Sequence, residues 1–150
     1  MKKDEKIIKD TTAELFKLLE IDGGFTVSVS EESIDLVLDT KDSGMVIGYH
    51  GDTLESLQLI LSLCLSKKLD VFKRVSIEVG DYKKNRSEWL KNLAIQTKEK
   101  VLAEEREIQL YDLKAWERRV IHLLLQDDED VTSESSGEGK DRVLVVSPKR

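Results

Sequence analysis

Two short stretches of the sequence bring together residue types that bind negatively charged ligands. The first is Ile47-Gly48-Tyr49-His50-Gly51, in which two glycines flank a phenol ring and an imidazole. Glycines let the backbone take conformations that a side chain blocks, and they leave backbone N–H groups accessible. The segment runs into an apolar helical pattern, and the start of a helix carries a partial positive charge. The pattern therefore predicts an anion site at this loop.

The helix after the loop is expected to begin at Asp52. Aspartate is a preferred N-cap, and Glu55 follows three residues later, as in a capping box. The apolar residues that follow predict one buried face: Leu54, Leu57, Ile60, Leu61, Cys64 and Leu65. Cys64, the only cysteine, is therefore interpreted as a small core residue, and an intrachain disulfide is impossible.

The second stretch is Glu117-Arg118-Arg119-Val120-Ile121-His122. Arg118 and His122 are four residues apart, so they are neighbours on one side of a helix. A guanidinium offers a planar fork of donors suited to phosphate, and an imidazole adds a donor or a stacking ring. We expect the pair on the exposed side, because the core side is predicted to be apolar: Trp116, Val120, Leu123 and Leu124.

No catalytic or metal-binding pattern accompanies these stretches. The sequence has one cysteine and two widely separated histidines, and it lacks a nucleophile elbow, a G-x-G-x-x-G motif and a Gly-Lys-Ser/Thr motif. The acidic run at residues 127–130 is interpreted as a solvated turn rather than as a set of metal ligands. We expect no enzyme activity, no catalytic residue, no metal and no cofactor.

The charge of the chain is uneven. The formal net charge is −6 over 150 residues, which argues mildly against non-specific nucleic-acid binding. Residues 67–86, however, hold seven basic and three acidic residues. We expect Lys83, Lys84 and Arg86, at the end of this segment, to face phosphate. No run of 18 apolar residues is present, so we expect no membrane insertion and a cytoplasmic location.

Hydrophobic periodicity predicts the elements that position the glycine loop. A helix is expected over residues 4–20, a pair of alternating strands over 25–29 and 34–38, and a third strand over 71–79. Residues 1–80 thus read helix-strand-strand-helix-strand, a small α+β domain with the loop before its second helix.

The second half of the chain predicts another small domain, residues 81–150, which begins with a long, stiff connecting helix. We expect its elements in this order: a helix over 81–105, a short strand over 106–110, a helix over 114–126, strands over 131–135 and 142–146, and a tail from Pro148.

The pattern around Gly48-Tyr49-His50-Gly51 resembles a type II KH domain over residues 4–80. In KH domains the G-x-x-G loop clamps the backbone of a few single-stranded nucleotides. The Arg118–His122 spacing after a long helix resembles the single-strand-binding R-three-H domain. The two domains in this order, joined through residues 80–86, closely resemble the Jag family of SpoIIIJ-associated bacterial RNA-binding proteins, without its usual N-terminal domain.

The resemblance implies a non-catalytic protein that binds single-stranded RNA, a post-transcriptional regulator linked to cell elongation or division. The RNA-binding residues it implies in the two motifs are Ile47, Gly48, Tyr49, His50, Gly51, Arg118 and His122. Single-stranded DNA is an alternative ligand. A second hypothesis is a regulatory scaffold that binds a small KH-domain partner, and a homodimer is a further option.

The loop departs from many KH domains, in which a Lys or Arg often stands between the two glycines. Here Tyr49 offers a ring for stacking on a base, and His50 offers a hydrogen bond to phosphate. We expect Gly48→Asp and Gly51→Asp to weaken RNA binding without unfolding the domain.

Overall fold

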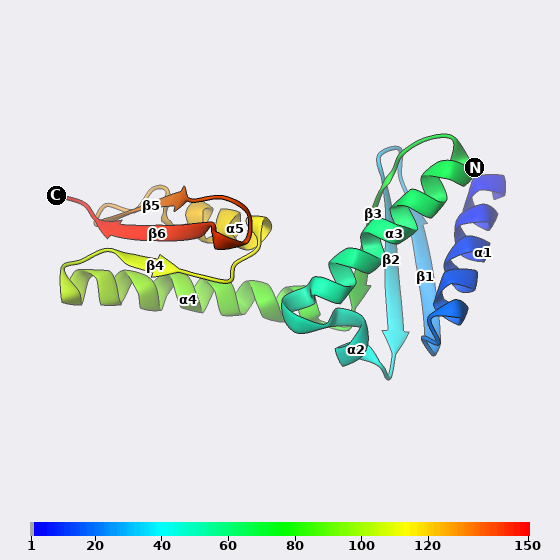
Figure 1. Cartoon of the computed structure of the whole chain (residues 1–150), viewed down its shortest axis with the longest axis horizontal. Coiled ribbons are helices and arrows are strands. Elements are labelled where there is room, and N and C mark those ends of the chain that lie inside the picture. The colour runs from blue at the N-terminus through cyan, green and yellow to red at the C-terminus, as the bar shows by residue number, and fades with distance from the viewer. Residues whose placement is uncertain (1) are drawn as a thin grey trace. The chain divides into compact units, whose positions relative to one another are not determined.

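The computed structural model describes residues 2–150. The chain divides into two compact units, Met1–Lys83 and Lys84–Arg150 (Figure 1). Each unit contains a three-stranded sheet with helices, so the predicted α+β class with two small domains is confirmed. Residue 1 of the predicted domain 1–80 lies outside the described residues. We keep residue 80 as the proposed boundary, because the long helix α4 (Tyr82–Glu104) begins two residues later.

The first unit is built on the sheet β1-β2-β3, formed by Gly23–Val29, Ser33–Thr40 and Arg74–Val79. The central strand β2 pairs antiparallel with β1 and parallel with β3. Alternate residues of β2 are buried, which gives the sheet a core-facing side. Helices α1 (Lys2–Leu18) and α3 (Asp52–Leu69) contribute to the same core, whose largest fully buried side chains include Ile8, Ile34, Leu36, Leu38, Leu61, Leu65 and Ile77.

The chain between β2 and α3 is more helical than the sequence pattern predicts. A short helix α2 (Ser43–Ile47) and a single 3-10 turn η1 (Tyr49–Gly51) precede α3. The predicted order helix-strand-strand-helix-strand therefore lacked one helix. Its five residues bury Val46 alone, so they show no helical period that could be read from the sequence.

The third strand begins three residues later than predicted, at Arg74, and its outer edge is closed by α3. The Val75 N–H donates to the Ser62 hydroxyl at 3.3 Å, and the Ile77 N–H donates to the Gln58 side-chain oxygen at 2.9 Å. These side chains satisfy backbone donors that an edge strand otherwise leaves open. On the same helix, Ile60 was expected in the core but is 48% exposed, and Cys64 is only half-buried.

The second unit contains a sheet of order β4-β6-β5, with all pairs antiparallel. Along the chain, α4 is followed by β4 (Ile108–Leu110), α5 (Ala115–Leu125), β5 (Val131–Ser136), the 3-10 turn η2 (Gly139–Asp141) and β6 (Val143–Pro148). Pro148 was expected in a tail, but it ends β6 opposite Val131. A strand end tolerates proline because its missing N–H costs little there.

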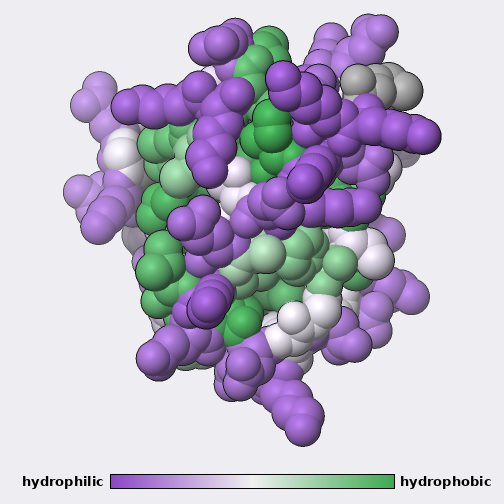
Figure 2. All heavy atoms as spheres, turned by 90° about the vertical axis from the view of Figure 1, so that its right-hand side faces the viewer, coloured by the Kyte–Doolittle hydropathy of each residue, from purple (hydrophilic) through white to green (hydrophobic). Residues whose placement is uncertain are grey.

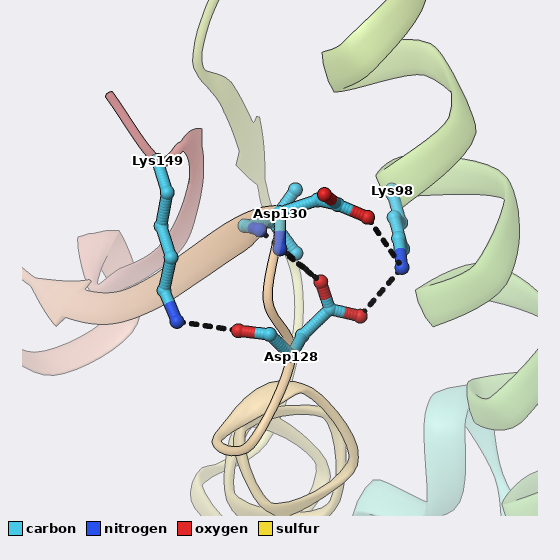
Figure 3. Close-up of polar contacts among 5 residues, drawn as sticks. Lys98, Asp128, Asp130 and Lys149 are labelled. Carbon is cyan, nitrogen blue, oxygen red and sulfur yellow. Dashed lines mark hydrogen bonds and ion pairs between the residues drawn. The ribbon is translucent and has the colours of Figure 1, made fainter.

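A polar cluster joins α4 to the turn before β5 (Figure 3). The Lys98 ammonium lies 2.7 Å from one Asp128 carboxylate oxygen and 3.4 Å from an Asp130 oxygen. The other Asp128 oxygen accepts the backbone N–H groups of Asp130 and Val131 at 2.8 and 3.2 Å. The Lys149 ammonium donates to the Asp128 carbonyl. The hydrogen bond to Lys98, followed by that from the Asp130 N–H, lowers the pKa of Asp128.

Candidate nucleic-acid interface

The glycine loop is a tight turn between α2 and α3. The Gly48 N–H donates to the Gly44 carbonyl at 2.9 Å and closes the end of α2. Gly48 then takes φ 70° with ψ −171°, a conformation essentially reserved for glycine, and Gly51 has φ 78°. His50 lies between them at φ 48°. The backbone path thus requires glycine at position 48 and favours it at position 51.

The start of α3 differs from the prediction. Gly51 is the N-cap residue, in the left-handed conformation, and Asp52 is the first residue of the helix. Asp52 as N-cap of a capping box is therefore wrong. The chain turns so sharply at Gly51 that a residue with a side chain is disfavoured at the capping position.

The two residues between the glycines form an aromatic pair. The rings of Tyr49 and His50 stack with centroids 4.0 Å apart and an interplanar angle of 19°. Tyr49 is 70% exposed, so one face of its ring lies against His50 while much of the side chain meets solvent. Ile47 is half-buried and packs against the core, which anchors the loop from behind.

Substitution of the glycines affects the loop itself. A Cβ at Gly48 would lie 2.1 Å from the Thr53 hydroxyl, and one at Gly51 would lie 2.9 Å from the Tyr82 hydroxyl. Both glycines also have positive φ. The expectation that Gly48→Asp and Gly51→Asp leave the domain intact therefore does not agree with the geometry, and Tyr49 and His50 are the better positions for testing the loop.

The basic residues after β3 differ in whether their charged groups already contact other residues of the chain. The Lys83 ammonium donates to the Ser76 hydroxyl at 2.6 Å and lies 4.0 Å from a Glu78 carboxylate oxygen. Lys84 is exposed and has no hydrogen bond or ion pair to another residue within 2–150. Lys84 is thus the freer of these two lysines for an external ligand.

Arg86, in contrast, belongs to the interior of the second unit. Its Nε lies 2.6 Å from a carboxylate oxygen of Glu117, and the two side chains are 12% and 0% exposed. Its guanidinium carbon also lies 4.1 Å from the ring centroid of Trp89. The positive charge of Arg86 is therefore balanced by a buried carboxylate rather than presented to solvent.

Glu117 is the central residue that the sequence pattern did not reveal. Its second oxygen accepts the Lys114 backbone N–H at 3.0 Å, so one carboxylate both caps the N-terminus of α5 and binds Arg86. The two partners are 31 residues apart, and no local spacing signals their contact. The only hint is a glutamate in the first turn of a helix, which is common for other reasons.

The core side of α5 is also different from the prediction. The buried residues are Glu117, Ile121 and Leu125, spaced by four. The residues expected there are largely exposed: Trp116 40%, Leu123 49% and Leu124 46%, with Val120 half-buried. The prediction was wrong because it built the core face from apolar residues alone and left out Glu117, which is buried with Ile121 and Leu125.

The two motif residues on α5 make different contacts. One terminal nitrogen of Arg118 donates to the Leu113 carbonyl at 2.5 Å, and the side chain is half-buried. His122 is exposed, and its Nδ1 lies 2.8 Å from the Ser133 hydroxyl on β5. Both side chains are thus held in place from within the second unit, His122 with its ring at the surface.

Two further features of the described chain bear on function. Residues 2–150 contain no group of three or more His, Cys, Asp or Glu side chains placed to share a metal ion. Within the same residues, no helix combines the length and the apolar character that a bilayer crossing requires.

The architecture and the motifs define the class of the protein. A three-stranded sheet with a helix, a G-x-x-G turn and a second helix between β2 and β3 is the arrangement of a type II KH domain. Residues 5–79 match the KH domain of KhpA/KhpB, and residues 88–148 match the R-three-H domain. The chain belongs to the Jag (KhpB) family.

Curated relatives agree with this assignment. The chain is 33% identical over 132 residues to the RNA-binding protein KhpB of Clostridium symbiosum, covering 88% of this chain and 60% of that protein. It is 32% identical over 127 residues to the protein of the same name from Bacillus subtilis, covering 83% and 61%. For the Streptococcus pneumoniae D39 protein the identity is 32% over 128 residues, covering 85% and 39%. The chain thus spans about three fifths or less of these relatives.

Proposed function

We propose that this protein binds single-stranded RNA through the G-x-x-G loop of its first unit and through the motif helix α5 of its second. The observation that carries the proposal is the backbone at Gly48 and Gly51, which forms the tight KH turn directly before the N-terminus of α3. A backbone phosphate at such a turn meets N–H donors and the positive end of a helix dipole. The names of the relatives, all RNA-binding proteins, support the same ligand class.

The loop attracts RNA without a fixed positive charge. Tyr49 and His50 replace the basic residues that many KH loops carry, and the exposed Tyr49 ring provides a surface on which a base can stack. Stacking on an aromatic side chain is worth about 1–3 kcal/mol per base. Two weak sites on one chain gain affinity through their effective concentration, which suits a protein of net charge −6.

The test is RNA binding by the full chain, measured by fluorescence anisotropy with a labelled single-stranded oligonucleotide over a series of salt concentrations. Tyr49→Ala is expected to weaken binding roughly fivefold or more, from the loss of one stacked base. Phe72→Ala is the matched control, since Phe72 is an exposed aromatic residue (64%) of the same unit outside the loop. If Tyr49→Ala and Phe72→Ala bind the RNA with equal affinity, the loop is not part of the binding site. A DNA version of the probe tests the alternative ligand.

A protein-binding scaffold is the second candidate, because α3 exposes apolar side chains. Leu59, Ile60 and Leu63 are 59%, 48% and 54% exposed. Figure 2 shows hydrophobic surface between charged side chains on one face of the molecule. Such surface favours protein contacts. Leu63→Lys is expected to abolish binding to a small KH-domain protein in a pull-down, whereas Leu123→Lys, an exposed leucine of the second unit, leaves it intact. Unchanged binding by both variants would argue against α3 as the contact.

We further propose that RNA binding takes place in the cytoplasm and regulates gene expression after transcription, with an effect on cell elongation or division. The family resemblance supports this role. Cells that lack the gene are expected to change in length and to be restored by the wild-type chain. Full restoration by Tyr49→Ala would separate the cellular role from RNA binding at the loop.

A further inference from the structure

We propose that Arg119, which lies beside the Arg-x-x-x-His motif rather than within it, is the α5 residue that contacts RNA phosphate, and that Arg118 positions the start of the helix. The inference rests on the proposed RNA-binding function. It names the ligand class of the second unit, the phosphodiester backbone of single-stranded RNA.

Arg118 is engaged in holding the segment that leads into α5. Its guanidinium donates to the Leu113 carbonyl at 2.5 Å, and its backbone N–H donates to the Lys114 carbonyl at 2.9 Å. Just upstream, Asp112 has a left-handed backbone with φ 55°, a conformation that is uncommon for a residue other than glycine. The half-buried Arg118 side chain is one of the groups that fix this turn.

Arg119 has no such partner. Its side chain is exposed and makes no hydrogen bond or ion pair with any other residue of the described chain. It precedes His122 by three positions, so the two side chains are neighbours on the outer surface of α5. The Ser133 hydroxyl, 2.8 Å from Nδ1, fixes the His122 ring beside it. An unpaired guanidinium next to a fixed imidazole is a suitable pair of donors for a phosphate group.

The surroundings on α5 also favour an anionic ligand. The helix Ala115–Leu125 contains a single acidic residue, Glu117, which is fully buried and paired with Arg86. The exposed surface of the helix therefore carries no free carboxylate, although the chain as a whole has 30 acidic residues. Trp116, three positions before Arg119 and 40% exposed, adds an indole ring on which a base can stack.

Two matched variants separate the roles of the adjacent arginines. Arg118→Gln and Arg119→Gln remove the same charge, and glutamine at 118 is too short to keep the hydrogen bond that the Arg118 guanidinium donates to the Leu113 carbonyl. Binding of the full chain to a fluorescein-labelled single-stranded oligouridine is measured over a range of salt concentrations. Arg119→Gln is expected to weaken binding about tenfold and to lower the slope of log Kd against log salt by about 0.7, one phosphate contact on a single strand.

Arg118→Gln is expected to leave that slope unchanged and to lower the midpoint of urea unfolding, and Arg119→Gln is expected to leave the midpoint unchanged. Arg119→Lys, which keeps the charge, should restore most of the slope. The inference is overturned if Arg118→Gln lowers the slope and Arg119→Gln does not, or if neither does. A wild-type chain that fails to bind the probe even at low salt refutes the proposed function itself, and the inference with it.

Discussion

The buried pair of Arg86 and Glu117 makes a quantitative prediction about the second unit. Arg86→Met preserves much of the side-chain volume and of the contact with Trp89, but it leaves the Glu117 carboxylate, 0% exposed, with its Lys114 N–H bond and without its counter-charge. A buried charge that loses its partner typically costs about 3–5 kcal/mol. We therefore expect Arg86→Met to reduce the free energy of unfolding of this unit by that amount.

Removing the carboxylate charge of Glu117 is expected to rescue part of this loss. Glu117→Gln keeps an oxygen that can accept the Lys114 N–H, and it removes the carboxylate charge. In the double variant Arg86→Met/Glu117→Gln no buried charge remains, so the loss relative to the wild type should shrink to about 1–2 kcal/mol, near the value of an ordinary hydrogen bond. Adding Glu117→Gln to Arg86→Met is thus expected to stabilise the protein, although each substitution alone destabilises the wild type.

The assay is favoured by the position of the tryptophans. The chain has two, Trp89 and Trp116, and both lie in the unit Lys84–Arg150. Tryptophan fluorescence during urea unfolding therefore reports on this unit, and a loss of 3–5 kcal/mol corresponds to a fall in melting temperature of roughly 12 °C or more. A loss below about 1 kcal/mol for Arg86→Met, or a double variant no more stable than Arg86→Met, would refute the account of Glu117 as a buried charge that depends on Arg86.

Three further predictions concern stability. The pKa of Asp128 is lower in the folded than in the unfolded chain, so its ionised carboxylate stabilises the fold at pH values above the unfolded pKa, and this stabilisation is lost as the pH falls through the folded pKa. Asp128→Asn should therefore be less stable than the wild type at pH 7, as measured by tryptophan fluorescence. The difference in stability between the two proteins should disappear in acid. Gly48→Ala should cost about 1–3 kcal/mol, whereas Gly44→Ala, in helix α2 with open space around its Cβ, should be neutral or stabilise by up to about 1 kcal/mol, both by circular dichroism. Gln58→Ala should cost about 1–3 kcal/mol by leaving a backbone donor of β3 unpaired.

A difference between Asp128→Asn and the wild type that persists at low pH would mean that the carboxylate charge is not its source. Equal melting temperatures for Gly48→Ala and Gly44→Ala would show that the loop relaxes around a methyl group. An unchanged unfolding midpoint for Gln58→Ala would mean that water replaces the lost acceptor.

The sequence predicts most of the elements, because most of them carry a clear period. Strands β1 and β2 alternate residue by residue, and α1 and α3 place apolar residues every three or four positions. The helix α2 has five residues and one buried side chain, too little for any period to appear. Hydrophobic periodicity also could not identify the N-cap residue of α3, because the left-handed backbone conformation of Gly51 depends on the turn that precedes the helix.

The orientation of α5 shows a different limit. Its sequence carries apolar residues on nearly every side, so a face through Trp116 and Leu124 and a face through Ile121 and Leu125 both satisfy a helical period. The choice between them depends on Glu117, and burial of a glutamate is acceptable only because Arg86 meets it from α4. A partner 31 residues away is tertiary information, which local spacing does not contain.

The glycine loop was predicted in type and in place, and its backbone has the conformations that only glycine adopts freely. The contact between Gly48 and Thr53, and the stacking of Tyr49 on His50, were not predictable because both depend on how tightly the turn closes. The roles of the individual residues in RNA binding stay predictions.

The pair of Arg86 and Glu117 also determines where the second unit can be separated from the rest of the chain. The segment that matches the R-three-H domain begins at residue 88, two positions after Arg86. A fragment cut at that point would keep every strand of the unit and α5, yet it would contain an ionised side chain sealed in its interior with no opposite charge. The same requirement, that Arg86 stays with Glu117, applies to gene fusion, to limited proteolysis and to the exchange of modules between proteins. The segment that can be inherited as a folded module therefore begins upstream of the segment that matches the R-three-H domain, and it includes the first turns of α4.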